Sequence, residues 1–210
     1  MKKGVALLGL LLLASVAILY FFVFNKKKPS EAPDPVRQNS LSVTSKHSEA
    51  FNKSVDNFMN AYYAMIEGFV NWDTGVVKKG SVSFKTALDS FKIDELKKDT
   101  LTYEEAERVW NAIKAETVAI AEDNNLDEQR GSLNILSQSL FDLLNKIHYD
   151  QTKIYYQECP MAFNEENKGN WLSKESAIRN PYLGTSHPKY HSGMLKCGST
   201  IDSLNFISSK

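Results

Sequence analysis

The sequence predicts a mainly α-helical protein: an antiparallel four-helix bundle with a loop-rich C-terminal segment containing cysteine and methionine, preceded by one transmembrane helix. Three observations lead to this prediction. Apolar residues recur at steps of three and four in four segments between residues 47 and 148, short polar turns separate these segments, and an uncharged apolar run lies near the N-terminus. We therefore expect a membrane anchor over residues 1–28, a linker over residues 29–46 and a helical extracytoplasmic domain over residues 47–210.

The predicted anchor extends from Gly4 to Phe24 and contains 21 residues without a charge. At the helical rise of about 1.5 Å per residue, this length spans a hydrocarbon layer of about 30 Å. The alternative is a signal peptide cleaved near Ser15 and Ala17, but cleavage there would leave a strongly apolar new N-terminus. We therefore predict an anchor that is retained.

The charges that flank the anchor hardly define its orientation, because Lys2 and Lys3 precede it and three lysines, residues 26–28, follow it. A very short N-terminal tail before an apolar run is typical of an export signal. We predict a single-pass protein of a bacterial inner membrane, held by residues 4–24, with residues 29–210 in the periplasm.

The predicted linker, residues 29–46, contains three prolines and many small polar residues, with no apolar stripe. Such a composition buries too little apolar surface to offset the entropy lost on ordering. We therefore predict an extended tether between the anchor and the domain.

The first two predicted helices cover about His47 to Asn71 and about Thr74 to Lys92. Their apolar stripes consist of Phe51, Val55, Phe58, Tyr62, Met65, Ile66 and Phe69 in the first, and of Val77, Phe84, Leu88 and Phe91 in the second. Two glycines lie in the second segment, and each lowers helix stability by about 1 kcal/mol relative to alanine.

The third predicted helix begins at Thr102, whose hydroxyl can cap the first turn while Glu105 reaches back to it, and continues to about Ile120. The fourth extends to about His148 and is capped by Asn125. We interpret the methionine and aromatic residues on all four stripes as core packing.

The charge distribution and the absence of known motifs exclude several classes of function. Five of the 25 basic residues lie within residues 1–28, which contain no acidic residue, so the remainder has 20 basic and 25 acidic residues and a net charge of −5. We expect no nucleic-acid partner, because phosphate binding requires a basic stripe. The sequence contains no G-x-S-x-G, H-E-x-x-H, P-loop, G-x-G-x-x-G or C-x-x-C-H motif, so we predict no catalytic residues and no enzyme.

The helical pattern ends near Tyr149. The β-prone run Thr152 to Gln157 is followed by many Gly, Pro, Asn and Ser residues, so residues 152–210 are predicted to form a loop-rich C-terminal module. Both cysteines lie in this module, 38 positions apart, and each has a methionine nearby. The pairs are Cys159 with Met161 and Cys197 with Met194.

Several motifs between Gln129 and Gly198 resemble the bacterial domain of unknown function 3347. They are Gln129-Arg130, Leu136-Ser137, Cys159-Pro160-Met161-Ala162-Phe163, Gly169-Asn170-Trp171-Leu172-Ser173, Ile178-Arg179-Asn180-Pro181-Tyr182 and Met194-Leu195-Lys196-Cys197-Gly198. The resemblance implies a helical exported domain of a kind that is sometimes fused to the membrane-fusion subunits of heavy-metal efflux pumps. It therefore implies a role near copper or related metals, with metal-efflux components as partners.

One segment departs from the family pattern. Between Tyr182 and Met194 this chain has the insertion Leu-Gly-Thr-Ser-His-Pro-Lys-Tyr-His-Ser-Gly, where a much shorter turn is expected. We therefore do not expect His187 and His191 to belong to a site shared by the family.

The cysteine pair has two main interpretations. In an oxidising compartment Cys159 and Cys197 would form a disulfide, which stabilises the fold by about 4 kcal/mol on the loop-entropy model. Alternatively, their thiolates and the thioethers of Met161 and Met194 supply the soft sulfur ligands that Cu(I) prefers. A disulfide and a copper thiolate exclude each other, so the protein could also switch between these states.

Two further interpretations of the cysteines are open. A Zn²⁺ site could use Cys159, His187, His191 and Cys197, because H-x₃-H spacing occurs in zinc sites, but it requires the inserted loop to fold back. The cysteines could also remain free thiols.

Five other residues are predicted to have structural roles. Trp171 and Leu172 close the core, and Asn180 fixes a turn before the following proline. His148 ends the fourth helix, where it interacts favourably with the helix dipole, and His47 is solvated at the start of the first helix.

These observations predict a membrane-anchored periplasmic domain that binds a soft metal, Cu(I), or assists a metal-efflux system. The alternative is a metal-free helical domain of the cell envelope, stapled by a disulfide, that binds another protein.

Overall fold

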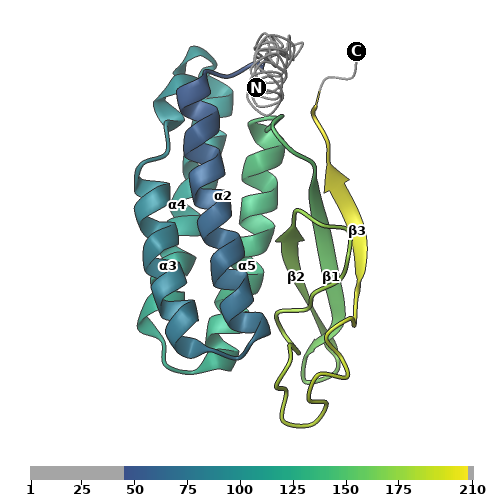
Figure 1. The fold of residues 1–210 in the computed structure, drawn as a ribbon. Coiled ribbons are helices and arrows are strands. Elements are labelled where there is room, and N and C mark those ends of the chain that lie inside the picture. The colour runs from purple at the N-terminus through teal and green to yellow at the C-terminus, as the bar shows by residue number, and fades with distance from the viewer. Residues whose placement is uncertain (1–44, 208–210) are drawn as a thin grey trace, which may run out of the picture. The chain divides into compact units, whose positions relative to one another are not determined.

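The computed structural model describes residues 45–207, which contain four α-helices, one 3-10 helix and a three-stranded sheet (Figure 1). In chain order the elements are α2 (Glu49–Val70), α3 (Thr74–Asp89), the 3-10 helix η1 (Ile93–Lys98), α4 (Thr100–Glu122), α5 (Leu126–Lys146), β1 (Ile154–Phe163), β2 (Asn167–Ser173) and β3 (Ser199–Leu204). The four helices predicted from the apolar periodicity are therefore confirmed, and the protein is mainly helical.

Side-chain caps define where the helices begin. At α5 the predicted cap is confirmed, because the side chain of Asn125 accepts a hydrogen bond from the backbone N–H of Asp127. At α4 the predicted start is wrong by two residues: the helix begins at Thr100, and Asp99 rather than Thr102 is the cap. The Asp99 carboxylate accepts the backbone N–H of Thr102 at 3.2 Å, and its negative charge also interacts favourably with the helix dipole.

Two helices end earlier than the periodicity predicts. α3 ends at Asp89 instead of Lys92, and η1 then buries Ile93 and Leu96 against the core. α5 ends at Lys146, so His148 lies beyond the helix, with a φ of 50° and an exposed side chain. The predicted position of His148 in the last helical turn is therefore wrong.

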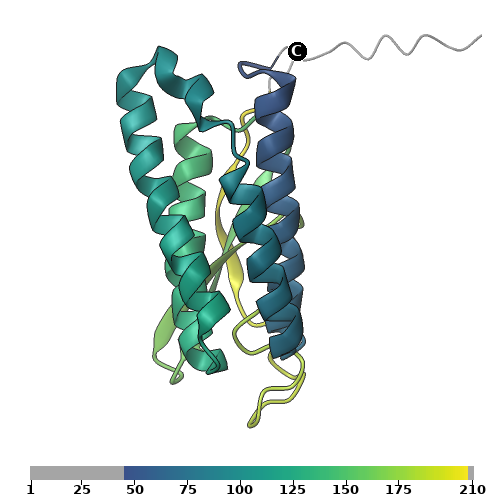
Figure 2. The same ribbon diagram turned by 90° about the vertical axis from the view of Figure 1, so that its left-hand side faces the viewer.

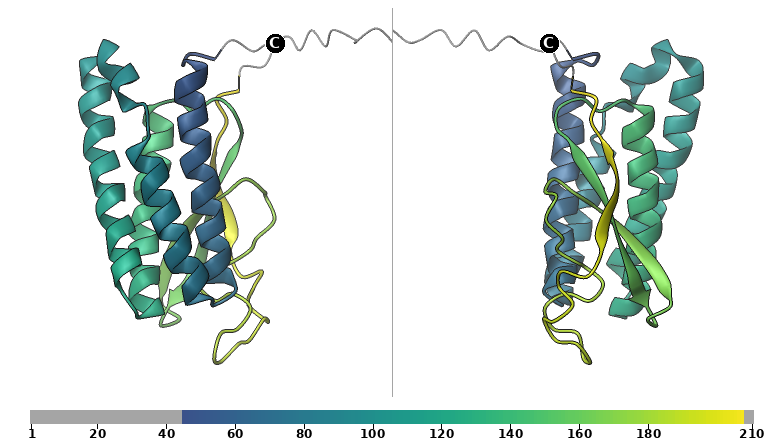
Figure 3. Two further views of the ribbon diagram at one scale, coloured as in Figure 1. Left: turned by 60° about the vertical axis from the view of Figure 1, so that its left-hand side comes forward. Right: turned by 90° about the vertical axis from the view of Figure 1, so that its right-hand side faces the viewer.

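The four α-helices lie side by side and alternate in direction along the chain, and the sheet covers one side of them (Figures 1 and 2). β1 is the central strand and pairs with β2 and β3, both in antiparallel orientation. Figure 3 shows the segment between β2 and β3 extending beyond the ends of the helices.

The C-terminal module contains a sheet and is not simply loop-rich, which corrects the sequence prediction. The β-prone run up to Gln157 is only the first part of β1, which continues through Cys159 and Pro160 to Phe163. Pro160 is exposed and lies where the pairing of β1 with β2 shifts, between Cys159 and Phe163. A proline is tolerated at such an irregularity, because the ladder there does not require its missing N–H.

A buried tyrosine joins the helices to the sheet. Tyr62 of α2 is fully buried, and its hydroxyl accepts the backbone N–H of Leu172 at 3.0 Å and lies 2.8 Å from the hydroxyl oxygen of Ser137. Trp171 and Leu172 are each 1 % exposed and belong to the same hydrophobic core as the helices. Their predicted role in closing the core is confirmed.

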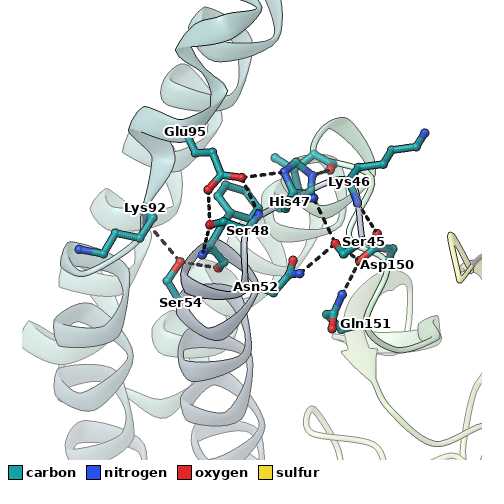
Figure 4. Close-up of polar contacts among 12 residues, drawn as sticks. Ser45, Lys46, His47, Ser48, Asn52, Ser54, Lys92, Glu95, Asp150 and Gln151 are labelled. Carbon is teal, nitrogen blue, oxygen red and sulfur yellow. Dashed lines mark hydrogen bonds and ion pairs between the residues drawn. The ribbon is translucent and has the colours of Figure 1, made fainter. Parts of the chain in front are cut away.

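Carboxylates hold the start of the described chain against the rest of the domain (Figure 4). Asp150 accepts hydrogen bonds from the Ser45 hydroxyl at 2.9 Å and from the Lys46 backbone N–H at 3.2 Å. The side chain of His47 is only 13 % exposed, and its Nε2 lies 2.6 Å from the carbonyl oxygen of Ile147. The prediction that His47 is solvated is therefore wrong, because the neighbouring carbonyl and carboxylates draw this segment onto the domain.

Within residues 45–207, no helix is both long enough and apolar enough to cross a membrane. The predicted anchor, Gly4 to Phe24, and residues 29–44 of the predicted linker lie outside the described residues.

Candidate functional site

The fold brings the two cysteines into contact. Cys159 lies on β1 and Cys197 lies two residues before β3, and their sulfur atoms are 3.8 Å apart. Both are free thiols, since a disulfide requires a sulfur–sulfur distance of about 2.05 Å. The separation is close to the distance between two sulfur ligands of a tetrahedral metal with bonds of about 2.3 Å, so the pair fits a metal ion without a large rearrangement.

Strand pairing and one glycine explain why the cysteines meet. Glu158 on β1 pairs with Ser199 on β3, so the residues just before β3 lie beside the middle of β1. Gly198 has a φ of 128°, and a Cβ atom added to it would lie 2.4 Å from the carbonyl oxygen of Glu158. Only glycine therefore allows the chain to approach β1 closely enough to place Cys197 next to Cys159.

Asn180 links Cys197 to the loop that precedes it. Its side-chain N–H donates to the carbonyl oxygen of Cys197 at 2.9 Å, and its side-chain oxygen accepts the backbone N–H groups of Tyr182 and Leu183. The predicted turn at Asn180 is therefore confirmed. The contact of the same amide with Cys197 cannot be predicted from the sequence, because it joins residues 17 positions apart in a loop.

Burial raises the pKa of the Cys159 thiol to about 11. Hydrogen bonds from the Asn180 side chain and from the backbone N–H of Met161 act in the opposite direction, but burial dominates. Cys159 is fully buried, so its thiol is protonated at neutral pH and reacts slowly until a proton is removed.

Each of the two predicted methionine ligands is tied to its cysteine by the backbone. The Met161 N–H contributes a hydrogen bond to Cys159, and the backbone N–H of Cys197 donates to the carbonyl oxygen of Met194 at 2.9 Å. Both methionine side chains are partly buried and pack against the common core.

A backbone hydrogen bond joins the two histidines within the insertion. The backbone N–H of His191 donates to the carbonyl oxygen of His187 at 2.8 Å, and Nδ1 of His187 accepts the backbone N–H of Lys189 at 3.1 Å. In the part of the chain that the structure describes, no three His, Cys, Asp or Glu side chains form a group able to hold a metal ion. The structure thus brings the cysteines together but does not gather the four residues of the predicted zinc site.

Fold and site together define a class: a helical domain with a small antiparallel sheet that carries a thiol pair. Residues 58–152 of this chain match a family described as "Protein of unknown function (DUF3347)", and the resemblance to that family is confirmed over these residues. The match begins within α2, covers the other helices and ends before β1. Of the motifs that suggested the resemblance, Gln129-Arg130 and Leu136-Ser137 lie inside the matched range, and the cysteine and methionine motifs lie outside it. No curated protein and no solved structure matches the chain significantly.

Proposed function

We propose that this protein binds one soft metal ion, Cu(I), between Cys159 and Cys197 and serves as a metal-binding accessory domain in the cell envelope. The observation that carries the proposal is the 3.8 Å separation of two thiol sulfurs that are 38 positions apart in the sequence. Thiolate and thioether sulfur are the ligand types that favour Cu(I) over harder cations.

The donors around the pair favour copper over zinc. Met161 and Met194 each lie within three residues of a cysteine in the sequence and are partly buried, so they are the sulfur donors that we propose beside the pair. Zinc sites use imidazole, carboxylate or further thiolate ligands, and residues 45–207 contain no such cluster around the cysteines.

The predicted anchor would keep this site at the membrane surface. A tether over residues 29–44, ending where Ser45 and Lys46 are bound to Asp150, would give the domain enough reach to contact membrane-bound metal-efflux components, which are the partners that we propose. The periplasmic location and the inner-membrane anchor belong to the same proposal.

A competition titration tests the proposal. Full-length protein purified under reducing conditions is titrated with Cu(I) against chelators of graded strength, beside Cys159→Ser, Cys197→Ser, Met161→Leu and Met194→Leu. We expect each cysteine variant to lose at least about 100-fold in affinity and each methionine variant about tenfold, because ligand loss should exceed the effect of outer-shell changes. His187→Ala and His191→Ala are the matched controls and should bind as the wild type does. If the wild type and both cysteine variants compete equally weakly with the chelators for Cu(I), the copper proposal is wrong.

The affinity for Cu(I) should rise with pH. Binding converts the Cys159 thiol, whose pKa is about 11, to a thiolate, so one proton is released at every pH below that value. Between pH 6 and pH 8 the apparent affinity should therefore increase about tenfold per pH unit from Cys159 alone. The same titration repeated at three pH values measures this slope. A flat profile would show that Cys159 is not a ligand.

A second function, a metal-free interaction domain stapled by a disulfide, is favoured by the complete burial of Cys159. A buried thiol in contact with a second thiol is a pair that an oxidising compartment would close. Thiols counted in protein denatured directly from cells distinguish the two functions. A count of zero supports the staple, and a count of two per chain contradicts it.

A further inference from the structure

A cavity of about 500 Å³ lies between the start of α5, the turn that joins β1 to β2, and the insertion after Tyr182. Its wall is rich in aromatic rings. The rings belong to Trp72, Phe163, Tyr182, His187 and Tyr190. A cavity of this size and lining suits a small ligand with an apolar or aromatic body.

A buried arginine in the same wall lacks a full set of acceptors. The side chain of Arg130 is 3 % exposed, and its guanidinium carbon, Cζ, lies 3.9 Å from the centre of the Trp72 ring. Nε donates to the carbonyl oxygen of Pro181 at 3.3 Å, and Nη1 lies 3.3 Å from the Asp127 carboxylate. Nη2 is buried without any hydrogen-bond partner. Buried charged donors without an acceptor are rare in native proteins, and a ligand is one of the few explanations for them.

The charges near the cavity restrict the ligand further. Asp127, Glu128 and Glu165 are among the lining residues, and Glu165 is paired with Lys189. Asp127 is 83 % exposed on its side chain, so solvent screens its attraction for Arg130. These acidic residues repel a doubly charged phosphate more strongly than a singly charged carboxylate, so a monocarboxylate is the anion best suited to pair with Arg130.

We propose that this cavity is a binding site for a small organic monocarboxylate, whose charged group pairs with Arg130 and whose body packs between the aromatic rings. Met161 lines the cavity, so the cavity borders the proposed metal site, but the proposal does not depend on metal binding. Because Nη2 is screened from water, the carboxylate must displace part of the wall, and the indole of Trp72 lies directly against the guanidinium. Binding should therefore shift the NMR signal of the Trp72 indole N–H.

Benzoate is the probe for this site. Full-length protein is titrated with benzoate, with its neutral analogue benzamide and with inorganic phosphate, and the indole N–H signals are followed by NMR, with Trp72→Phe assigning the relevant signal. We expect benzoate to bind at least about tenfold more tightly than benzamide, because a charge-assisted hydrogen bond is gained, and we expect no shift with phosphate. Binding of benzamide or phosphate as tight as that of benzoate would overturn the proposal.

Substitutions at two cavity-lining residues, Arg130 and Gly131, test whether the ligand binds in this cavity. Arg130→Met keeps a long apolar side chain but removes the guanidinium, and it should weaken benzoate binding at least about tenfold, whereas Arg179→Met, at an exposed arginine paired with Glu67, should not. If Arg130→Met fails to fold, Gly131→Leu keeps the arginine and narrows the cavity. Gly131 lines the cavity, and a Cβ atom there meets no heavy atom within 4 Å, so the helix can accept a larger side chain without a clash at Cβ. Unchanged benzoate affinity in the Gly131→Leu variant would contradict the site.

Discussion

Replacing Gly198 with alanine is expected to lower the free energy of unfolding by about 3 kcal/mol and to abolish the proposed Cu(I) binding. The residue has a φ of 128°, which non-glycine residues rarely adopt, and the added Cβ would lie 2.4 Å from the carbonyl oxygen of Glu158. Glu158 belongs to the central strand and cannot move without loss of its pairing with Ser199. Relief of the clash must therefore move Cys197 away from Cys159.

Chemical denaturation and the Cu(I) competition titration measure the two effects of Gly198→Ala separately. Gly131→Ala is the control, because its added methyl group meets open space near the start of α5 and should leave Cu(I) affinity unchanged. The control should also stabilise the protein by up to about 1 kcal/mol, since alanine favours the helix. If Gly198→Ala retains wild-type stability and Cu(I) affinity, the close approach of the chain to β1 does not position the site.

The helices were predictable because their signal is local. Residues such as Phe51, Phe58 and Leu140 recur at helical spacing and are all fully buried in the structure. The errors lie at the ends, where neighbouring side chains compete. Asp99 and Thr102 are both good caps, and periodicity alone could not show that the carboxylate would take the N–H groups of the first turn.

The sheet was largely missed because its pairing is not local. β3 joins β1 from about 40 residues further along the chain, and its serines and Asp202 weaken the short strand signal of Thr200 and Ile201. The motifs around Cys159 and Cys197 identified the donors of the candidate site. Their contact depends on the β1–β3 register and on Gly198, and neither can be read from spacing. In the sequence Arg130 stands out only as part of a family motif. The burial of its guanidinium beside Trp72 depends on tertiary packing and cannot be predicted from the sequence.

Replacing Trp171 with alanine should lower the free energy of unfolding by about 4 kcal/mol, the range found for large aromatic residues removed from a core. Trp171 is 1 % exposed and packs edge-on against Tyr182, with ring centres 6.1 Å apart. Its ring also lies against Gly198, next to Cys197. The cavity left by the substitution therefore opens at the point where the sheet covers the helices and the thiol pair is held.

Two measurements, the free energy of unfolding and the reaction rate of Cys159, distinguish the loss of core packing at Trp171 from the loss of its support for the thiol pair. Trp171→Phe keeps most of the buried surface and should cost only about 1–2 kcal/mol, while Ile201→Ala, at a residue 48 % exposed on β3, should stay within about 0.5 kcal/mol of the wild type. The rate at which Cys159 reacts with a thiol reagent at constant pH should rise in Trp171→Ala more than in either control, because the thiol becomes accessible through local opening. A loss of stability below about 1 kcal/mol in Trp171→Ala would mean that the sheet is not packed on the helices through this residue. The thiol pair would then need another support to remain buried, and the proposed metal site would lose its physical basis.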